Sequence, residues 1–120
     1  MNEQQFQKIQ AKYGDEYLLR QLAEECIELA HASLKLIRAM RGETPLPIEK
    51  ARASFLEEVA DVRVMYLVLS RMLGHDEILS IQEQSKEKEC RMIERLLGEG
   101  AKEDEGHTDL QAGRTRIDVV

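Results

Sequence analysis

The sequence predicts an all-α fold, an antiparallel bundle of about four helices. The 120 residues include only two prolines and no tryptophan, and 42% of them are hydrophobic and 33% charged, a composition typical of a soluble helical domain. Apolar residues recur at helical spacing through most of the first 97 positions. A Gly/Pro cluster at 42–47 interrupts this pattern and predicts an antiparallel helical hairpin.

The hairpin's first arm is expected to be preceded by a short helix. Residues 2–13 are weakly amphipathic, and Gly14 followed by Asp15 reads as a helix stop and then an N-cap. The first arm should then run from about Glu16 to Arg41. Its apolar residues cover roughly half of the helix circumference, which is wider than one neighbouring helix needs.

The second arm should begin near Pro47, a residue suited to the first turn of a helix, and end near Gly74. A fourth helix should then start with Asp76 as its cap and run to about Leu97, where Gly98 stops it.

We therefore expect one helical domain over residues 1–97. After it, residues 98–120 are rich in glycine and charge and are expected to form a largely flexible tail.

The middle of the second arm, residues 59–69, is apolar on nearly all sides. A helix of this kind must be buried on all sides, and a chain of this size has too few other helices to bury it. We therefore expect a homodimer or a dimer of dimers. Asp61 lies within this stretch, where an unpartnered carboxylate would be costly.

Charge and cysteine usage narrow the possible partners. The net charge of −6 disfavours binding to nucleic acid polymers. The sequence has no apolar run of 18 residues and no signal peptide, so we expect a cytoplasmic protein without a membrane partner. Cys26 and Cys90 lack zinc-site spacing and are expected to be free thiols.

Two acidic blocks occupy the two arms of the hairpin: Glu24-Glu25-Cys26-Ile27-Glu28 and Glu57-Glu58-Val59-Ala60-Asp61. Residues three apart share one face of a helix, so each block presents a pair of carboxylates, Glu25 with Glu28 and Glu58 with Asp61. Glu28 and Glu58 each lie 15 residues from position 43, and Glu25 and Asp61 each lie 18 residues from it. Folding the hairpin should therefore bring the four carboxylates together.

Four neighbouring carboxylates must be protonated, paired with bases, or bound to a cation. Oxygen ligands suit hard cations, and Mg²⁺ above all where phosphates complete its coordination. A single acidic block is more often a solvated helix face. Two blocks equally far from a turn favour a metal site over that interpretation.

A di-iron site is a second chemical possibility, because Glu28 and His31 have the helical ExxH spacing that such sites use. Those sites need two such motifs, and the second arm offers Asp61 in place of a histidine. We therefore disfavour di-iron chemistry and expect His31 to face solvent.

The ordered set of EExxE and ExxD motifs across a helical hairpin resembles the MazG-like all-α nucleoside triphosphate pyrophosphohydrolases, relatives of the dimeric dUTPases. The motifs here are Glu24-Glu25-Cys26-Ile27-Glu28 and Glu58-Val59-Ala60-Asp61. Downstream, Lys88-Glu89-Cys90-Arg91 is similar to the family's basic element, and the likeness covers roughly residues 15–97.

The resemblance implies hydrolysis of NTPs or dNTPs between the α and β phosphates, giving a monophosphate and pyrophosphate. It implies Mg²⁺, with Mn²⁺ as a possible substitute, held by four carboxylates: Glu25, Glu28, Glu58 and Asp61. Glu24 or Glu57 would orient or deprotonate the attacking water. Lys88 and Arg91 would stabilise the leaving pyrophosphate, and Gln21 would contact the base or sugar.

A different class of function stays open at this point, a non-catalytic dimeric helical interaction module that uses the apolar second arm. It predicts no metal-dependent behaviour. On its own, the basic stripe Lys88, Arg91 and Arg95 is also more often a solvated face.

Overall fold

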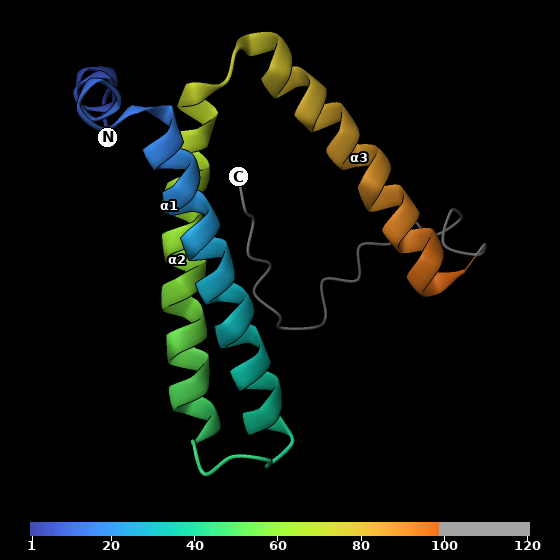
Figure 1. The fold of residues 1–120 in the computed structure, drawn as a ribbon. Coiled ribbons are helices and arrows are strands. Elements are labelled where there is room, and N and C mark those ends of the chain that lie inside the picture. The colour runs from blue at the N-terminus through green and yellow to red at the C-terminus, as the bar shows by residue number, and fades with distance from the viewer. Residues whose placement is uncertain (99–120) are drawn as a thin grey trace. The chain divides into compact units, whose positions relative to one another are not determined.

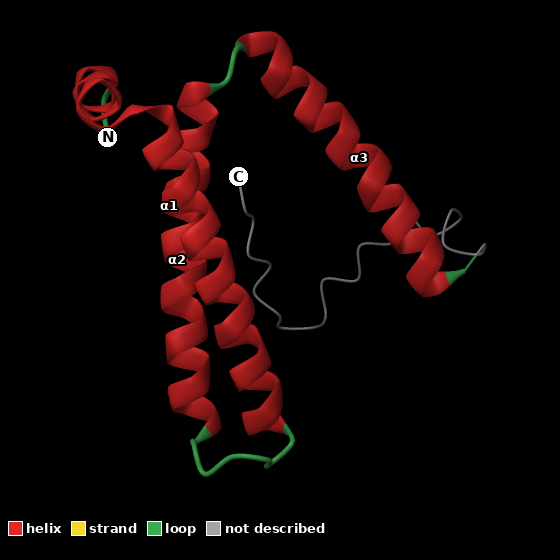
Figure 2. Ribbon diagram, viewed as in Figure 1, coloured by secondary structure: helices red, strands yellow, loops and turns green. Residues whose placement is uncertain are grey.

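A computed structural model describes residues 1–98 as three α-helices: α1 (Glu3–Met40), α2 (Ile48–Met72) and α3 (His75–Leu97) (Figure 1). Within these residues no strand is present, which confirms the predicted helical class (Figure 2). The first two of the four predicted helices both lie within α1, on either side of a break at Gly14. Apart from Gly98, the predicted flexible tail lies outside the described residues.

The start of α1 and its interruption follow from local sequence. The side chains of Asn2 and Gln5 each accept a hydrogen bond from the other's backbone N–H, at 2.8 and 2.9 Å, and form a capping box. Gly14 then breaks the helical geometry with φ 81° and ψ 168°, a conformation open to glycine, and the first segment turns away from the rest of α1 (Figure 1). Across the break, the carboxylate of Asp15 accepts a hydrogen bond from the Gln10 side chain at 2.8 Å.

The turn between α1 and α2 is a Schellman motif. Gly42, at φ 68°, donates its N–H to the carbonyl of Ala39 at 3.1 Å, and Glu43 donates to that of Arg38 at 2.9 Å. Pro47 is the N-cap of α2, and its carbonyl accepts hydrogen bonds from the next turn. The predicted break at 42–47 is therefore confirmed, and α1 and α2 form an antiparallel hairpin (Figure 1).

The apolar core lies at the end of the hairpin remote from the turn. Phe6, Leu18 and Val68 are buried together, and the half-buried hydrophobic residues packed on them are Ile9, Met65 and Met72. Each fully buried side chain of this size contributes about 1.5–3 kcal/mol. The short first segment of α1 thus supplies part of the core.

Arg71, in the last turn of α2, forms hydrogen bonds with the first residues of the chain. Its guanidinium donates to the Glu3 carboxylate at 2.8 Å and to the Met1 carbonyl at 2.7 Å. Toward the turn, the buried residues are alanines at positions 32, 39 and 51. Their small side chains permit close packing of the two helices. The acidic blocks lie between this alanine contact and the apolar core.

The chain divides into two compact units, and α3 belongs to the second, which begins at Gly74. Gly74 is the N-cap of α3, and its N–H donates to the Glu77 carboxylate at 3.0 Å. The prediction of Asp76 as the cap is wrong, because the glycine and Glu77 already form the cap and Asp76 falls in the first turn. An acidic residue there still complements the helix dipole.

The apolar stretch of α2 is only partly covered. Val64 is 54% exposed and Leu67 is 50% exposed. Asp61 is exposed as well, so the burial cost expected for its carboxylate does not arise. Of the helices in the described part of the chain, none combines the length and apolar character that crossing a membrane requires.

Candidate metal centre

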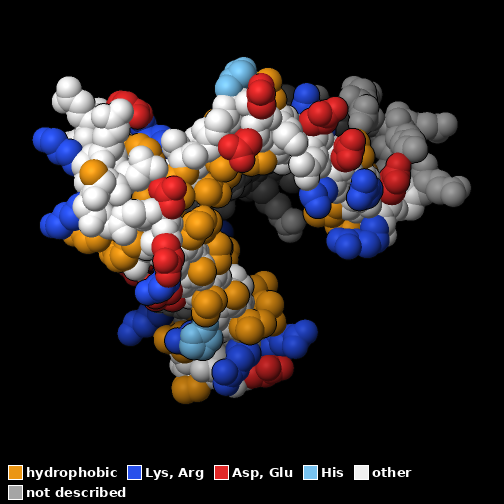
Figure 3. Space-filling view, turned by 45° about the horizontal axis from the view of Figure 1, so that its top comes forward, with side chains coloured by type: hydrophobic (Ala, Val, Ile, Leu, Met, Phe, Trp, Pro, Cys, Tyr) orange, Lys and Arg blue, Asp and Glu red, His pale blue; other side chains and the backbone are white. Residues whose placement is uncertain are grey.

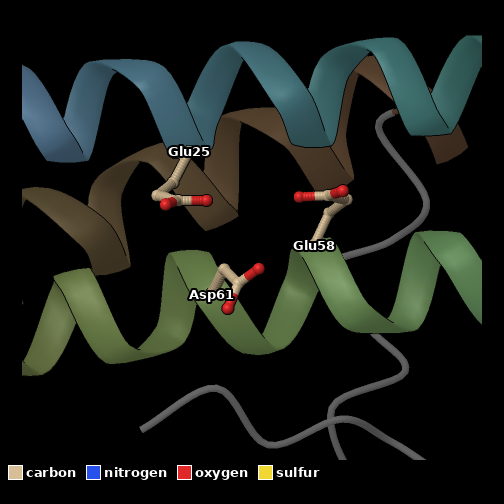
Figure 4. Close-up of side chains that lie close together, drawn as sticks. All are labelled: Glu25, Glu58 and Asp61. Carbon is tan, nitrogen blue, oxygen red and sulfur yellow. The ribbon is translucent and has the colours of Figure 1, made fainter.

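Three carboxylates converge between the arms of the hairpin. Glu25 comes from α1, and Glu58 and Asp61 come from α2 (Figure 4). One oxygen from each lies within 4.8 Å of the other two. The antiparallel packing and the equal spacing from the turn bring these groups together, as the sequence predicts.

In two of these side chains, one carboxylate oxygen is shielded from water and has no hydrogen-bond partner among the described residues. Glu25 and Glu58 are half-buried, and the Oε2 atom of each is inaccessible to solvent. Neither of these oxygens accepts a hydrogen bond from any described residue. A buried carboxylate oxygen without a donor is unfavourable, so each requires a proton or a cation.

The pKa values of Glu25 and Glu58 are also raised, which is consistent with the need of these carboxyls for a proton or a cation. Burial raises the pKa of Glu25 above its ordinary value, and the charges of Glu28 and Asp61 raise it further. Burial likewise raises the pKa of Glu58, with added contributions from the charges of Glu28, Asp61 and Glu25 and from a side-chain hydrogen bond with Glu28. The two carboxyls therefore ionise less readily in the folded chain, and a bound cation would reverse the effect.

Glu28, the fourth predicted ligand, stands at the edge of the group. It is exposed and does not belong to the set of three whose oxygens lie within 4.8 Å. Its charge nevertheless acts on both Glu25 and Glu58. No histidine belongs to the set in the described part of the chain, which further disfavours a di-iron site.

A cavity of about 380 Å³ adjoins the carboxylates on the side toward the turn. Glu28 and Glu58 line it, together with His31, Lys35 and Leu46. A substrate attached to a metal at the carboxylates thus has room beside it. His31 is exposed, as predicted, although it borders this cavity.

Of the predicted water-activating residues, Glu24 has a partner. Its carboxylate accepts a hydrogen bond from the side chain of Gln21, at 3.2 Å. The predicted substrate contact and one predicted catalytic acid are therefore coupled on adjacent turns of α1. Glu57 is exposed on α2.

The predicted phosphate ligands lie on α3, in the second unit. Lys88 and Arg91 are both exposed, and Arg91 forms an ion pair with Glu87 at 3.7 Å. This pair joins two exposed side chains one turn apart, which makes it weak and easily exchanged for a phosphate.

The sequence argument missed His31 and Lys35 as residues bordering the site. A signal was present, because they follow Glu28 by three and seven residues and so continue its helix face toward the turn. Comparison with protein-family models, curated proteins and solved structures gave no match.

Proposed function

We propose that this protein hydrolyses nucleoside triphosphates, or their deoxy forms, between the α and β phosphates in a Mg²⁺-dependent reaction. The observation that carries the proposal is the trio Glu25, Glu58 and Asp61, with two shielded oxygens that lack a hydrogen-bond donor. The MazG-like order of the motifs supplies the reaction class.

Each carboxylate has a distinct part in the proposal. Glu25, Glu58 and Asp61 hold the metal, and Glu28 completes the site from its edge. Bound there, Mg²⁺ would neutralise the phosphates and lower the pKa of a water molecule. Mn²⁺ prefers similar oxygen ligands and is the expected substitute.

Glu24 is the better supported of the two candidates for positioning the attacking water. Its hydrogen bond from Gln21 restricts its side chain, whereas the exposed side chain of Glu57 forms no ion pair or hydrogen bond with another residue in the described part of the chain. A held carboxylate loses less conformational freedom when it orients water. Gln21 stays a candidate contact to the base or sugar, because its amide oxygen and second N–H are not used in the hydrogen bond to Glu24.

Lys88 and Arg91 stabilise the charge on the pyrophosphate as it leaves. Assembly into a homodimer or a dimer of dimers is part of this proposal. Its support is the uncovered face of α2, where Val64, Tyr66 and Leu67 are all exposed in the single chain.

The same face supports the competing function, a helical interaction module without catalysis. Exposed apolar residues on both arms, such as Ile27 and Leu67, are what a protein partner would cover. For the interaction module, the two shielded oxygens of Glu25 and Glu58 would be satisfied by protonation, and the module predicts no response to divalent metal.

The decisive experiment measures pyrophosphate release from a panel of NTPs and dNTPs with Mg²⁺, with Mn²⁺, and with a chelator. We expect release from at least one nucleotide with either metal and none with chelator. A protein that is folded by circular dichroism yet inactive on every nucleotide would favour the interaction module. Light scattering on the same samples tests assembly, and a monomer at micromolar concentration would contradict the dimer.

A further inference from the structure

The hairpin carries a second, smaller cavity at its turn. Its volume is about 140 Å³, and four residues line it: Lys35, Arg38, Thr44 and Leu46. Lys35 and Leu46 also line the larger cavity beside the carboxylates. The two cavities therefore adjoin, and together they lead from the acidic centre to the turn.

The chemistry at the turn is opposite to that of the acidic centre. Lys35 and Arg38 lie three residues apart on one face of α1, and neither forms an ion pair with another described residue. Between residues 35 and 52 the chain has five cationic side chains and two acidic ones. Figure 3 shows blue Lys and Arg side chains gathered around this end of the hairpin.

Two further features suit this cavity to an anion. The hydroxyl oxygen of Thr44 accepts a hydrogen bond from the Leu46 N–H at 3.3 Å, which leaves the hydroxyl proton available as a donor. The last carbonyls of α1 would repel an anion, but Gly42 and Glu43 already donate to two of them. A guanidinium beside an ammonium and a hydroxyl is a donor set suited to phosphate.

We propose that this cavity is a phosphate subsite for a second phosphate group that the nucleotide carries on its sugar, remote from the polyphosphate. Lys35 and Arg38 follow Glu28 by seven and ten residues, which places them about 10 to 15 Å further along α1. The long side chains of Lys35 and Arg38 can extend toward the carboxylates, which shortens the distance that a ligand must span between the two sites. The assignment as a substrate subsite rests on the proposed nucleotide hydrolysis, whereas the anion binding itself does not.

The test measures binding by calorimetry, with Mg²⁺ to neutralise the acidic centre, of a nucleoside 3′,5′-bisphosphate and of the matching nucleoside 5′-monophosphate, neither of which has an α–β bond to hydrolyse. We expect the bisphosphate to bind at least tenfold more tightly at low salt, with the advantage shrinking as salt rises. Lys35→Gln and Arg38→Gln should each remove most of this advantage. Lys50→Gln and Arg41→Gln, which change cations outside both cavities, should retain it.

Three results would overturn the proposal. The first is equal affinity for the two nucleotides. The second is a Lys50→Gln control that loses as much of the bisphosphate's affinity advantage as Lys35→Gln does, which would show that the advantage depends on net charge and not on this cavity. The third is inorganic phosphate binding as tightly as the bisphosphate, which would identify a site for the free anion. Because no step requires hydrolysis, binding with no catalysis would contradict only the proposed function, and catalysis without the bisphosphate advantage would contradict only this subsite.

Discussion

The middle and the turn of the hairpin differ in almost every physical respect. In the middle, half-buried carboxylates are closer to one another than their charges favour, and Glu25 and Glu58 have raised pKa values. At the turn, Lys35 and Arg38 are exposed, and neither pairs with another described residue. The acidic region needs protons or a cation, and the basic side chains are open to an anion, so the proposed metal-bound, phosphate-rich ligand would suit both.

The largest expected effect comes from removing a ligand charge in the middle. Glu25→Gln, Glu58→Gln and Asp61→Asn keep side-chain shape and should lower pyrophosphate release by orders of magnitude, because a metal ligand acts on the transition state. Without metal, the variants should fold at least as well as the parent, since each removes a charge from a repelling group. Circular dichroism and rates on the same samples check both expectations.

Glu49→Gln is the matched control, since Glu49 is exposed on α2 and outside both acidic blocks. Full activity in Glu25→Gln together with Asp61→Asn would refute the assignment of the metal centre.

Next in size is Arg91→Ala on α3. Removing one donor to a developing phosphate charge should slow hydrolysis by about 10²- to 10³-fold, by analogy with oxyanion contacts. Metal affinity should be unchanged, because Arg91 does not belong to the group of carboxylates that forms the centre. Lys86→Ala, on the same helix, is the control, and equal rates in the two variants would exclude a special role for Arg91.

A smaller effect is expected on stability from the metal alone. A divalent ion present at 100 times its dissociation constant should stabilise the folded chain by about 2.7 kcal/mol. The melting temperature should therefore rise with millimolar Mg²⁺ or Mn²⁺, and Asp61→Asn should reduce the rise. A melting curve unchanged by either ion would argue against the metal centre.

The pH dependence of the metal-free protein gives a related test. Because Glu25 and Glu58 have raised pKa values when folded, the folded state binds more protons than the unfolded state between pH 4.5, the ordinary pKa, and the raised pKa values. Their stabilising contribution is thus complete below that pH and is lost as pH rises through the raised pKa values. Denaturant unfolding in chelator should show this decline, which Glu58→Gln should flatten and Glu49→Gln should not.

The smallest effect concerns the turn. Gly42→Ala should destabilise the hairpin by about 1–2 kcal/mol, because alanine disfavours the left-handed conformation at φ 68°. An added Cβ would meet no atom of a more distant residue within 4 Å, so the cost arises within the local backbone and not from packing against other residues. Gly42→Asn should lose less, since asparagine tolerates this region. Equal denaturation midpoints for all three proteins would contradict this account.

Much of the hairpin was predictable because local signals and long-range geometry agree. Gly14 and the 42–47 cluster mark real breaks, and the equal spacing of the acids brings Glu25, Glu58 and Asp61 together. Spacing along a helix fixes which face a residue occupies. It does not fix how far a long side chain reaches, and Glu28 therefore stands at the edge of the group.

Two features were not predicted from the sequence. One is the choice between two possible N-caps of α3, and the other is a cavity formed by the folded turn between α1 and α2. Asp76 is an acceptable cap, but Gly74 with Glu77 forms the cap two residues earlier. The cavity that Lys35, Arg38 and Thr44 line exists only because the turn folds back beside α1. The sequence shows that Lys35 and Arg38 are cationic. Only the folded turn shows that they line the same cavity.

The equal spacing of the two acidic blocks from the turn also bears on which insertions and deletions the chain can accept. Removing one residue between Glu28 and Met40 would rotate the α1 block by about 100° and shift it by about 1.5 Å, which turns Glu25 away from Asp61. Removing one residue from the connection between the helices, at 43–46, changes neither helix. Length variation in related chains should therefore concentrate in that connection, while the number of residues from each acid to its helix end stays constant.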